Sequence, residues 1–120
     1  MSKKLEFAAE RPDASTVIYR LHGTLHGTAD GYAFQDDVRR RLAEGTRKLV
    51  VDLQDVDHID SSGIGIFATI VASARNTGAR FALAALPPRV EQVMRVVRLL
   101  DVIECGATVE DAIARISNPS

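Results

Sequence analysis

The chain has only one cysteine, no long apolar run and almost no net charge. Because Cys105 stands alone, an internal disulfide is excluded, which fits a reducing cytoplasm. Its place between Glu104 and Gly106 favours a small hydrophobic residue near a strand end over a reactive thiol. No apolar run approaches the roughly 18 residues of a membrane span. The basic residues 1–5 lack the apolar region of a signal peptide. We therefore expect a cytoplasmic protein without membrane insertion.

The 15 basic and 16 acidic residues are mixed along the chain and leave a formal net charge of −1. This balance provides no bulk attraction to nucleic acid. An apolar share of 46% and a charged share of 26% are typical of globular proteins. The 120 residues predict one domain over residues 1–120, with a core over about 5–116 and a frayed end at 117–120.

Hydrophobic periodicity and turn residues divide the chain into alternating elements. Strands are predicted at residues 5–9, 16–25, 48–53, 80–86 and 101–103. Helices are predicted at 29–44, from Ser61 to a stop at 76–78, at 88–100 and at 108–116. The order β-β-α-β-α-β-α-β-α predicts an α/β fold, with about four helices on a mixed, largely parallel sheet of four to five strands.

The most informative stretch is residues 50–67, in which a buried strand leads through an acidic segment into a helix. Strand 48–53 is apolar without alternation, as expected when both faces of a strand are covered. The helix then begins at Asp60, Ser61 and Ser62, any of which could cap its free amides, worth about 1 kcal/mol. A phosphoserine here would add about −1.5 to −2 charges beside the carboxylates. The helix dipole would tolerate that anion, but a partner surface fitted to this spot would not.

Two opposite faces are predicted for the helix after Ser61. Four apolar residues at helical spacing are expected to form its core stripe: Ile64, Phe67, Val71 and Ala74. The opposite face is expected to be exposed and consists of Ser62, Ile66, Thr69 and Ser73, bordered by Ile70. Because this second face includes apolar residues, we hypothesise that it docks another protein.

Metal binding and catalysis are not supported by the patterns in the chain. The aspartates of residues 55–60 lack the sixth-position glycine and twelfth-position glutamate of a calcium loop. His22 and His26 are four apart on a predicted strand, roughly 13 Å from each other, and so cannot share a metal. No glycine precedes Ser61 or Ser62 by two residues, so the nucleophile-elbow pattern fails. We predict no metal, no cofactor and no enzymatic activity.

An aspartate phosphoacceptor is the alternative that remains open. Asp52 ends the buried strand, where receiver domains carry the residue that accepts a phosphoryl group. No acidic pair follows the N-terminal strand to hold magnesium. Residues 23–28 also lack the Gly-Lys-Ser/Thr ending of a nucleotide-binding loop.

Residues 50–53, Val56 and residues 59–65 together resemble the signature of STAS-domain anti-sigma factor antagonists, and the similarity covers about residues 5–116. The resemblance implies that Ser61, or as second choice Ser62, is phosphorylated. It implies that the unmodified protein binds an anti-sigma factor that is also a serine kinase of the GHKL ATPase type. Phosphorylation would release this partner, and a PP2C-type phosphatase would reverse the change.

One position departs from the family pattern, because His26 stands where family members usually carry an acidic residue. This residue is expected to lie near the phosphorylation site and to alter partner choice, phosphorylation or pH sensitivity. The expected partner surface comprises His26, Asp57, His58, Asp60, Ser62, Gly63, Ile66, Thr69, Ile70 and Ser73. The alternative function is a STAS docking subunit of a stressosome-like or transport complex without a serine switch.

Overall fold

The computed structural model describes residues 4–117. Of the end expected to fray at 117–120, Ser117 is instead the last residue of a helix, and 118–120 lie outside the described residues. The strands are β1 (Glu6–Asp13), β2 (Thr16–Leu25), β3 (Lys48–Ile59), β4 (Arg80–Ala84) and β5 (Glu104–Gly106). The helices are α1 (Ala29–Ala43), α2 (Ser61–Thr77), α3 (Pro88–Val96) and α4 (Val109–Ser117), with a 3₁₀ turn η1 (Leu99–Asp101) before β5. The predicted order of elements and the α/β fold class are confirmed.

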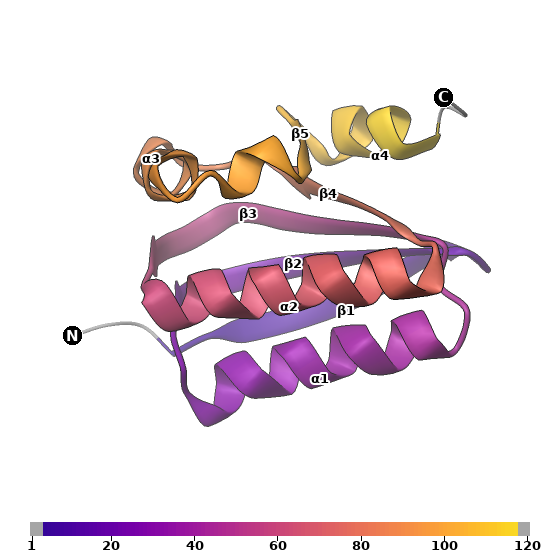
Figure 1. The fold of residues 1–120 in the computed structure, drawn as a ribbon, viewed down its shortest axis with the longest axis horizontal. Coiled ribbons are helices and arrows are strands. Elements are labelled where there is room, and N and C mark those ends of the chain that lie inside the picture. Colours follow the sequence, from indigo (N-terminus) through magenta and orange to yellow (C-terminus); the bar gives the residue numbers. More distant parts are fainter. Residues whose placement is uncertain (1–3, 118–120) are drawn as a thin grey trace.

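One sheet with the strand order β1-β2-β3-β4-β5 forms the centre of the fold. Only β1 is antiparallel to its neighbour, and the other strands run parallel to one another. Helices α1 and α2 cover one face of the sheet and α4 lies on the other (Figure 1). Alternate residues of β2 therefore enter different cores, Tyr19 on the α1–α2 side and Ile18 on the α4 side.

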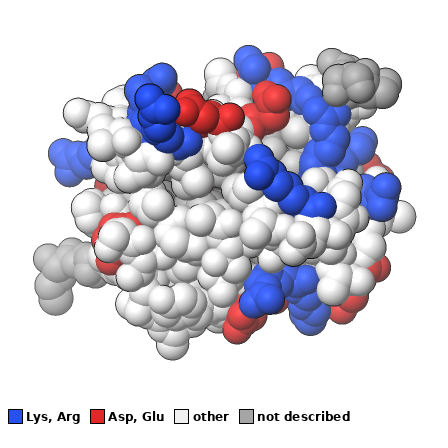
Figure 2. All heavy atoms as spheres, in the orientation of Figure 1, with Lys and Arg blue, Asp and Glu red and all other residues white. Residues whose placement is uncertain are grey.

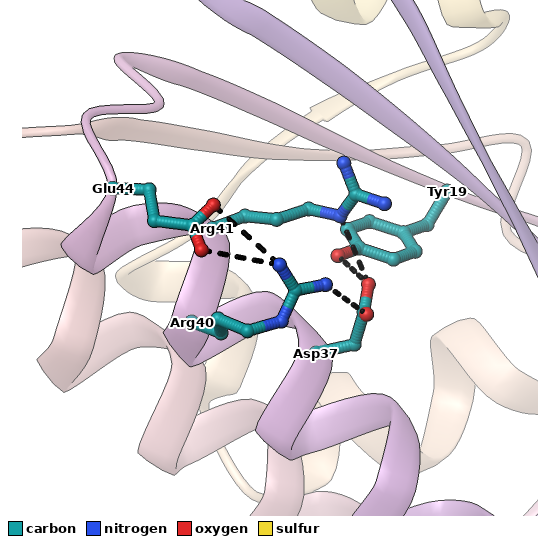
Figure 3. A network of polar contacts seen from close by, with 5 residues as sticks. All are labelled: Tyr19, Asp37, Arg40, Arg41 and Glu44. Atoms are coloured by element: carbon teal, nitrogen blue, oxygen red, sulfur yellow. Dashed lines mark hydrogen bonds and ion pairs between the residues drawn. The ribbon is translucent and has the colours of Figure 1, made fainter.

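A polar network fastens α1 to β2 (Figure 3). The Tyr19 hydroxyl donates to Oδ2 of Asp37 at 2.5 Å, and Arg40 and Arg41 pair with the same carboxylate at 2.7 and 3.0 Å. Burial raises the pKa of Tyr19, and the bond to the Asp37 carboxylate raises it further, so the phenol stays protonated. Because this phenol is fully buried, the network fixes how α1 lies on the sheet.

Strand β3 is twice as long as predicted and continues through the acidic segment to Ile59. The prediction of a loop after residue 53 was wrong because β2 also continues, pairing Gly23 with Val56 and Leu25 with Ile59 after register shifts. Val56 and Ile59 point into the core while Asp55 and Asp57 remain exposed. The acidic segment is thus one side of a strand, which holds its carboxylates in fixed positions.

The C-terminal elements also differ from their predicted bounds. Helix α3 ends at Val96, and Arg98 adopts a left-handed conformation with φ of 63° that turns the chain into η1. Val97, which lies just beyond the end of α3, is 49% exposed. The last strand lies at Glu104–Gly106 instead of residues 101–103, because the chain first turns to bury Leu99 and Ile103.

Candidate functional site

The candidate site lies where β2 and β3 end and α2 begins, at one end of the parallel strands (Figure 1). Asp60 is the N-cap of α2: its Oδ1 accepts a hydrogen bond from the Gly63 backbone N–H at 2.9 Å. The Asp60 backbone N–H donates to the Leu25 carbonyl at 3.3 Å, which ties the start of α2 to the end of β2. Among the three capping candidates, Asp60 is therefore the residue whose side chain caps the helix, through the Gly63 amide.

The second carboxylate oxygen of Asp60 is held by a residue distant in sequence. Oδ2 lies 2.9 Å from Nδ1 of His26, which follows β2. Burial opposes ionisation of Asp60, but the hydrogen bonds from Gly63 and His26 outweigh it and lower the pKa of the carboxyl. The cap is therefore a carboxylate, and both of its oxygens have partners.

Ser61 and Ser62, the first two residues of α2, are both exposed. Their surroundings differ, because the turn at Gly27 lies against Ser62. A Cβ added at Gly27 would lie 2.8 Å from both Cβ and Oγ of Ser62 and 3.2 Å from the Tyr32 hydroxyl. Ser62 is therefore enclosed on one side by the β2–α1 turn and by the first turn of α1. No local pattern predicts this contact, and Tyr32, which is 45% exposed, was not predicted to be a neighbour of the site.

All three histidines of the chain lie at this end of β2 and β3. His22 pairs with Asp55 at 3.4 Å between the two strands, and the rings of His26 and His58 are 6.1 Å apart. With Asp57 and Asp60, these side chains form a border of imidazoles and carboxylates beside the two serines. His22 was not expected to be part of it.

Two of the expected partner-binding residues are instead part of the core. Ile66 is 1% exposed and Ile70 is fully buried, so the prediction that they lie on an exposed face was wrong. The reason is that α2 packs against α1 as well as against the sheet, which widens its buried arc. Gly63 is also buried, and Thr69 and Ser73 are half-buried. Of the predicted core stripe, Phe67 and Ala74 are buried, whereas Ile64 and Val71 are partly so.

The exposed part of α2 carries no charge over a long distance. No Asp, Glu, Lys or Arg occurs between Asp60 and Arg75. Figure 2 shows the corresponding face of the molecule, where the middle of the surface is mostly uncharged and charged side chains gather toward its edges. A charge added at Ser61 would therefore change the electrostatic character of an otherwise neutral helix face.

Asp52 does not have the environment of a phosphoacceptor. Its side chain is buried and its Oδ2 pairs with Arg20 at 2.8 Å. The Gln54 backbone N–H donates to Oδ1 at 3.0 Å. Because both oxygens are engaged and little of the group meets solvent, the geometry disfavours the receiver-like alternative.

The remaining chemistry of residues 4–117 is limited. Within this range, no three or more His, Cys, Asp or Glu side chains come together as a metal site. Over the same residues, every helix is too short or too polar to cross a bilayer. Cys105 is half-buried in β5, and burial raises the pKa of its thiol, which keeps it in the weakly nucleophilic protonated form.

Comparisons with known proteins agree with this arrangement. A Thermotoga neapolitana protein whose name ascribes to it the role of an anti-sigma factor antagonist is 31% identical over 75 residues, 62% of this chain, and the match spans only 66% of that relative's length. An anti-sigma factor antagonist from Mycobacterium paratuberculosis has the same fold, with a TM-score of 0.82 and 19% identity over 96% of each chain. Unphosphorylated SpoIIAA gives 0.81 and 23% identity over 96% of this chain and 99% of its own. The STAS domain model matches residues 8–112, and the chain therefore belongs to the STAS domain family.

Proposed function

We propose that the chain is a phosphorylation-switched binding module that acts as an anti-sigma factor antagonist. With Ser61 unmodified, it binds an anti-sigma factor that is also a serine kinase of the GHKL ATPase type, and phosphorylation of Ser61 releases that partner. A PP2C-type phosphatase restores the binding form. The module has no catalytic activity of its own and operates in the cytoplasm, where its partner finds ATP.

The observation that carries this proposal is the position of Ser61: exposed, at the first turn of α2, directly after the Asp60 cap. A phosphate at a helix N-terminus meets free amides and the positive end of the helix dipole, so the domain can accept it. A partner seated on the uncharged face of α2 would meet about −1.5 to −2 new charges. The same modification is therefore mild for the fold and severe for the interface.

The surroundings of the two serines favour Ser61 over Ser62. The Ser62 hydroxyl lies against Gly27 and near the Tyr32 hydroxyl, so a phosphate on it would displace the β2–α1 turn. A kinase must also reach the hydroxyl from solvent with its own catalytic groups around it. The names of similar proteins support an anti-sigma partner. The exposed Asp57 and His58 and the half-buried His26 and Asp60 would border the contact.

The test compares binding of four purified proteins to the kinase-type ATPases of the source organism: wild type, Ser61→Ala, Ser61→Asp and the matched control Ala68→Asp. Ala68 is exposed on the same helix, two turns further along. Ser61→Asp should lose at least about 10-fold in affinity, because like charges in an interface cost several kcal/mol. Ser61→Ala should bind the partner with the same affinity as the wild type. After the wild type is incubated with the partner and ATP, phosphopeptide mass spectrometry should find the phosphate on Ser61.

Two outcomes would count against the proposal. The first is full affinity of Ser61→Asp for a partner that binds the wild type. The second is a phosphate that maps to another residue, or none after incubation with the partner and ATP. If Ala68→Asp weakens binding as much as Ser61→Asp, the interface is sensitive to charge anywhere on α2 and the serine is not its specific switch.

A further inference from the structure

The contact between His26 and the cap of α2 gives this chain a titratable group beside the candidate phosphoserine. We propose that His26 is a charge-compensating positioning residue for phosphorylated Ser61: when protonated it neutralises Asp60, and so lowers the cost of placing a phosphate dianion next to that carboxylate. Phosphorylation is then tolerated better at low pH than at high pH. This inference rests on the proposed function of Ser61.

The start of α2 brings together three groups that can carry charge: the His26 imidazole, the Asp60 carboxylate and a phosphate on Ser61. Nδ1 of His26 is 2.9 Å from Oδ2 of Asp60, and Ser61 is the next residue along the chain. The other Asp60 oxygen is occupied by the Gly63 N–H, so the carboxylate cannot rotate away from the phosphate without losing the helix cap. The repulsion between Asp60 and a phosphate is thus built into the fold, and His26 is the side chain in contact that can offset it.

Other ionisable groups near His26 also contribute to the net charge around Asp60 and the phosphate. His58 approaches from β3 and Asp60 from the start of α2. Asp57 directly precedes His58 on β3, and the Tyr32 hydroxyl of α1 lies near Gly27, the residue after His26. Imidazole is the side chain whose ordinary pKa lies between pH 5 and 8, and a phosphate monoester also changes charge near pH 6. At high pH the Asp60 carboxylate and the phosphate dianion lie next to each other with no imidazolium charge beside them. At low pH up to two imidazolium charges oppose them.

The sign of the effect follows from linkage. A phosphate makes protonation of His26 more favourable, and by reciprocity a protonated His26 favours the dianionic phosphate over the monoanionic one. The second pKa of the Ser61 phosphate should therefore be lower in the presence of His26 than in its absence. A purely structural His26, acting as a neutral hydrogen-bond donor to Asp60, would leave that pKa unchanged.

The decisive experiment needs no kinase and no partner. Phosphoserine is incorporated at position 61 during translation, and its ³¹P NMR signal is titrated from pH 5 to 8 in three backgrounds: wild type, His26→Gln and His22→Gln. Glutamine can keep a hydrogen bond to Asp60 but cannot carry the charge. His22 is the matched control, because it pairs with a different carboxylate, Asp55, at 3.4 Å.

The phosphate should titrate about half a pH unit higher in His26→Gln than in wild type, the order of magnitude expected when one nearby positive charge is removed in a water-like dielectric. His22→Gln should differ from wild type by a much smaller amount. Superimposable curves for wild type and His26→Gln would overturn the inference, as would an equal shift in His22→Gln. The melting temperature supplies a check without mutation: phosphorylation should lower it more at pH 8 than at pH 6, and an equal loss at both pH values contradicts the proposal.

These results are independent of the partner-binding test. If the phosphate titration depends on His26 while Ser61→Asp binds every partner normally, His26 compensates charge but the proposed switch fails. If Ser61→Asp releases the partner while the phosphate titrates at the same pH in wild type and His26→Gln, the proposed switch is supported and the compensating role of His26 is refuted.

Discussion

Two glycines in the first turns of α2 provide a sharp test of how this helix meets the sheet. A Cβ added at Gly63 would lie 2.5 Å from the Leu25 carbonyl oxygen and 2.7 Å from Cγ1 of Ile59. A Cβ added at Gly65 would have no heavy atom within 4 Å. The two positions are two residues apart in the same helix, so the same substitution, Gly→Ala, should have opposite effects.

The magnitudes follow from two competing effects. Alanine in a helix interior is favoured over glycine by roughly 0.5–1 kcal/mol, and at Gly65 nothing opposes this gain. At Gly63 the new methyl group meets a backbone carbonyl that cannot rotate away, and overpacking of this kind typically costs about 1–3 kcal/mol. Displacing the Gly63 N–H from the Asp60 carboxylate adds up to about 1 kcal/mol. Gly63→Ala should therefore lose about 1–3 kcal/mol of stability overall, while Gly65→Ala gains up to about 1 kcal/mol.

Urea unfolding at equilibrium measures both changes as shifts of the midpoint at constant slope. In a thermal melt the gap between the variants should be about 6 to 16 °C, since 1 kcal/mol corresponds to about 4 °C at this chain length. Equal stability of the two variants, or a more stable Gly63→Ala, would show that α2 does not approach the end of β2 as closely as the structure requires. The argument for a rigid Asp60 cap would then fail with it.

Three further changes test the polar contacts. Tyr19→Phe removes the donor to the Asp37 carboxylate and should cost about 1–2 kcal/mol in urea unfolding, since a bond to a charged group is lost. Burial opposes ionisation of Asp37, but hydrogen bonds from Tyr19 and the arginines lower the pKa of Asp37 below its value in the unfolded chain. The ionised Asp37 carboxylate therefore stabilises the folded state above about pH 4, and this contribution is lost as the pH falls further. Asp37→Asn should accordingly flatten the loss of stability below pH 4 in an acid titration followed by circular dichroism. Asp60→Ala should lower the unfolding free energy by about 1 kcal/mol through loss of the cap to Gly63, and no change would refute that cap.

The order of elements could be predicted from sequence because local signals mark their ends. Gly78 closes α2 in the left-handed conformation with φ of 76°, and Thr108 caps α4 by accepting the Asp111 N–H at 3.0 Å. The apolar run of residues 48–53 correctly predicted a strand covered on both faces. Each of these features depends on residues close together in the chain.

The failures arise where a distant element decides. Nothing near Val56 shows that β2 will still be alongside, yet this pairing turns a predicted loop into the second half of β3. The face of α2 shows the same limit: periodicity identifies an apolar arc, but the packing of α1 decides that Ile66 and Ile70 belong to the interior. A helix covered on two sides buries more than one stripe, so its outward face cannot be read from its own sequence.

The candidate site combines both kinds of information. Its serines are visible in sequence, but the contacts that distinguish them are not: Gly27 meets Ser62 and His26 meets Asp60 only because β2 and β3 end together. In the resulting arrangement, a charge added at Ser61 has one energetic cost for the folded domain and a different one for a bound partner. A phosphate on Ser61 lies at a helix N-terminus in water, where the dipole and the free amides lower its cost to the fold. A protein seated over the same uncharged helix face would exclude that water and meet the charge at low dielectric, where repulsion is several times stronger. In the proposed mechanism, a single hydroxyl would therefore control binding without unfolding the domain, because Ser61 lies at the boundary between these two environments.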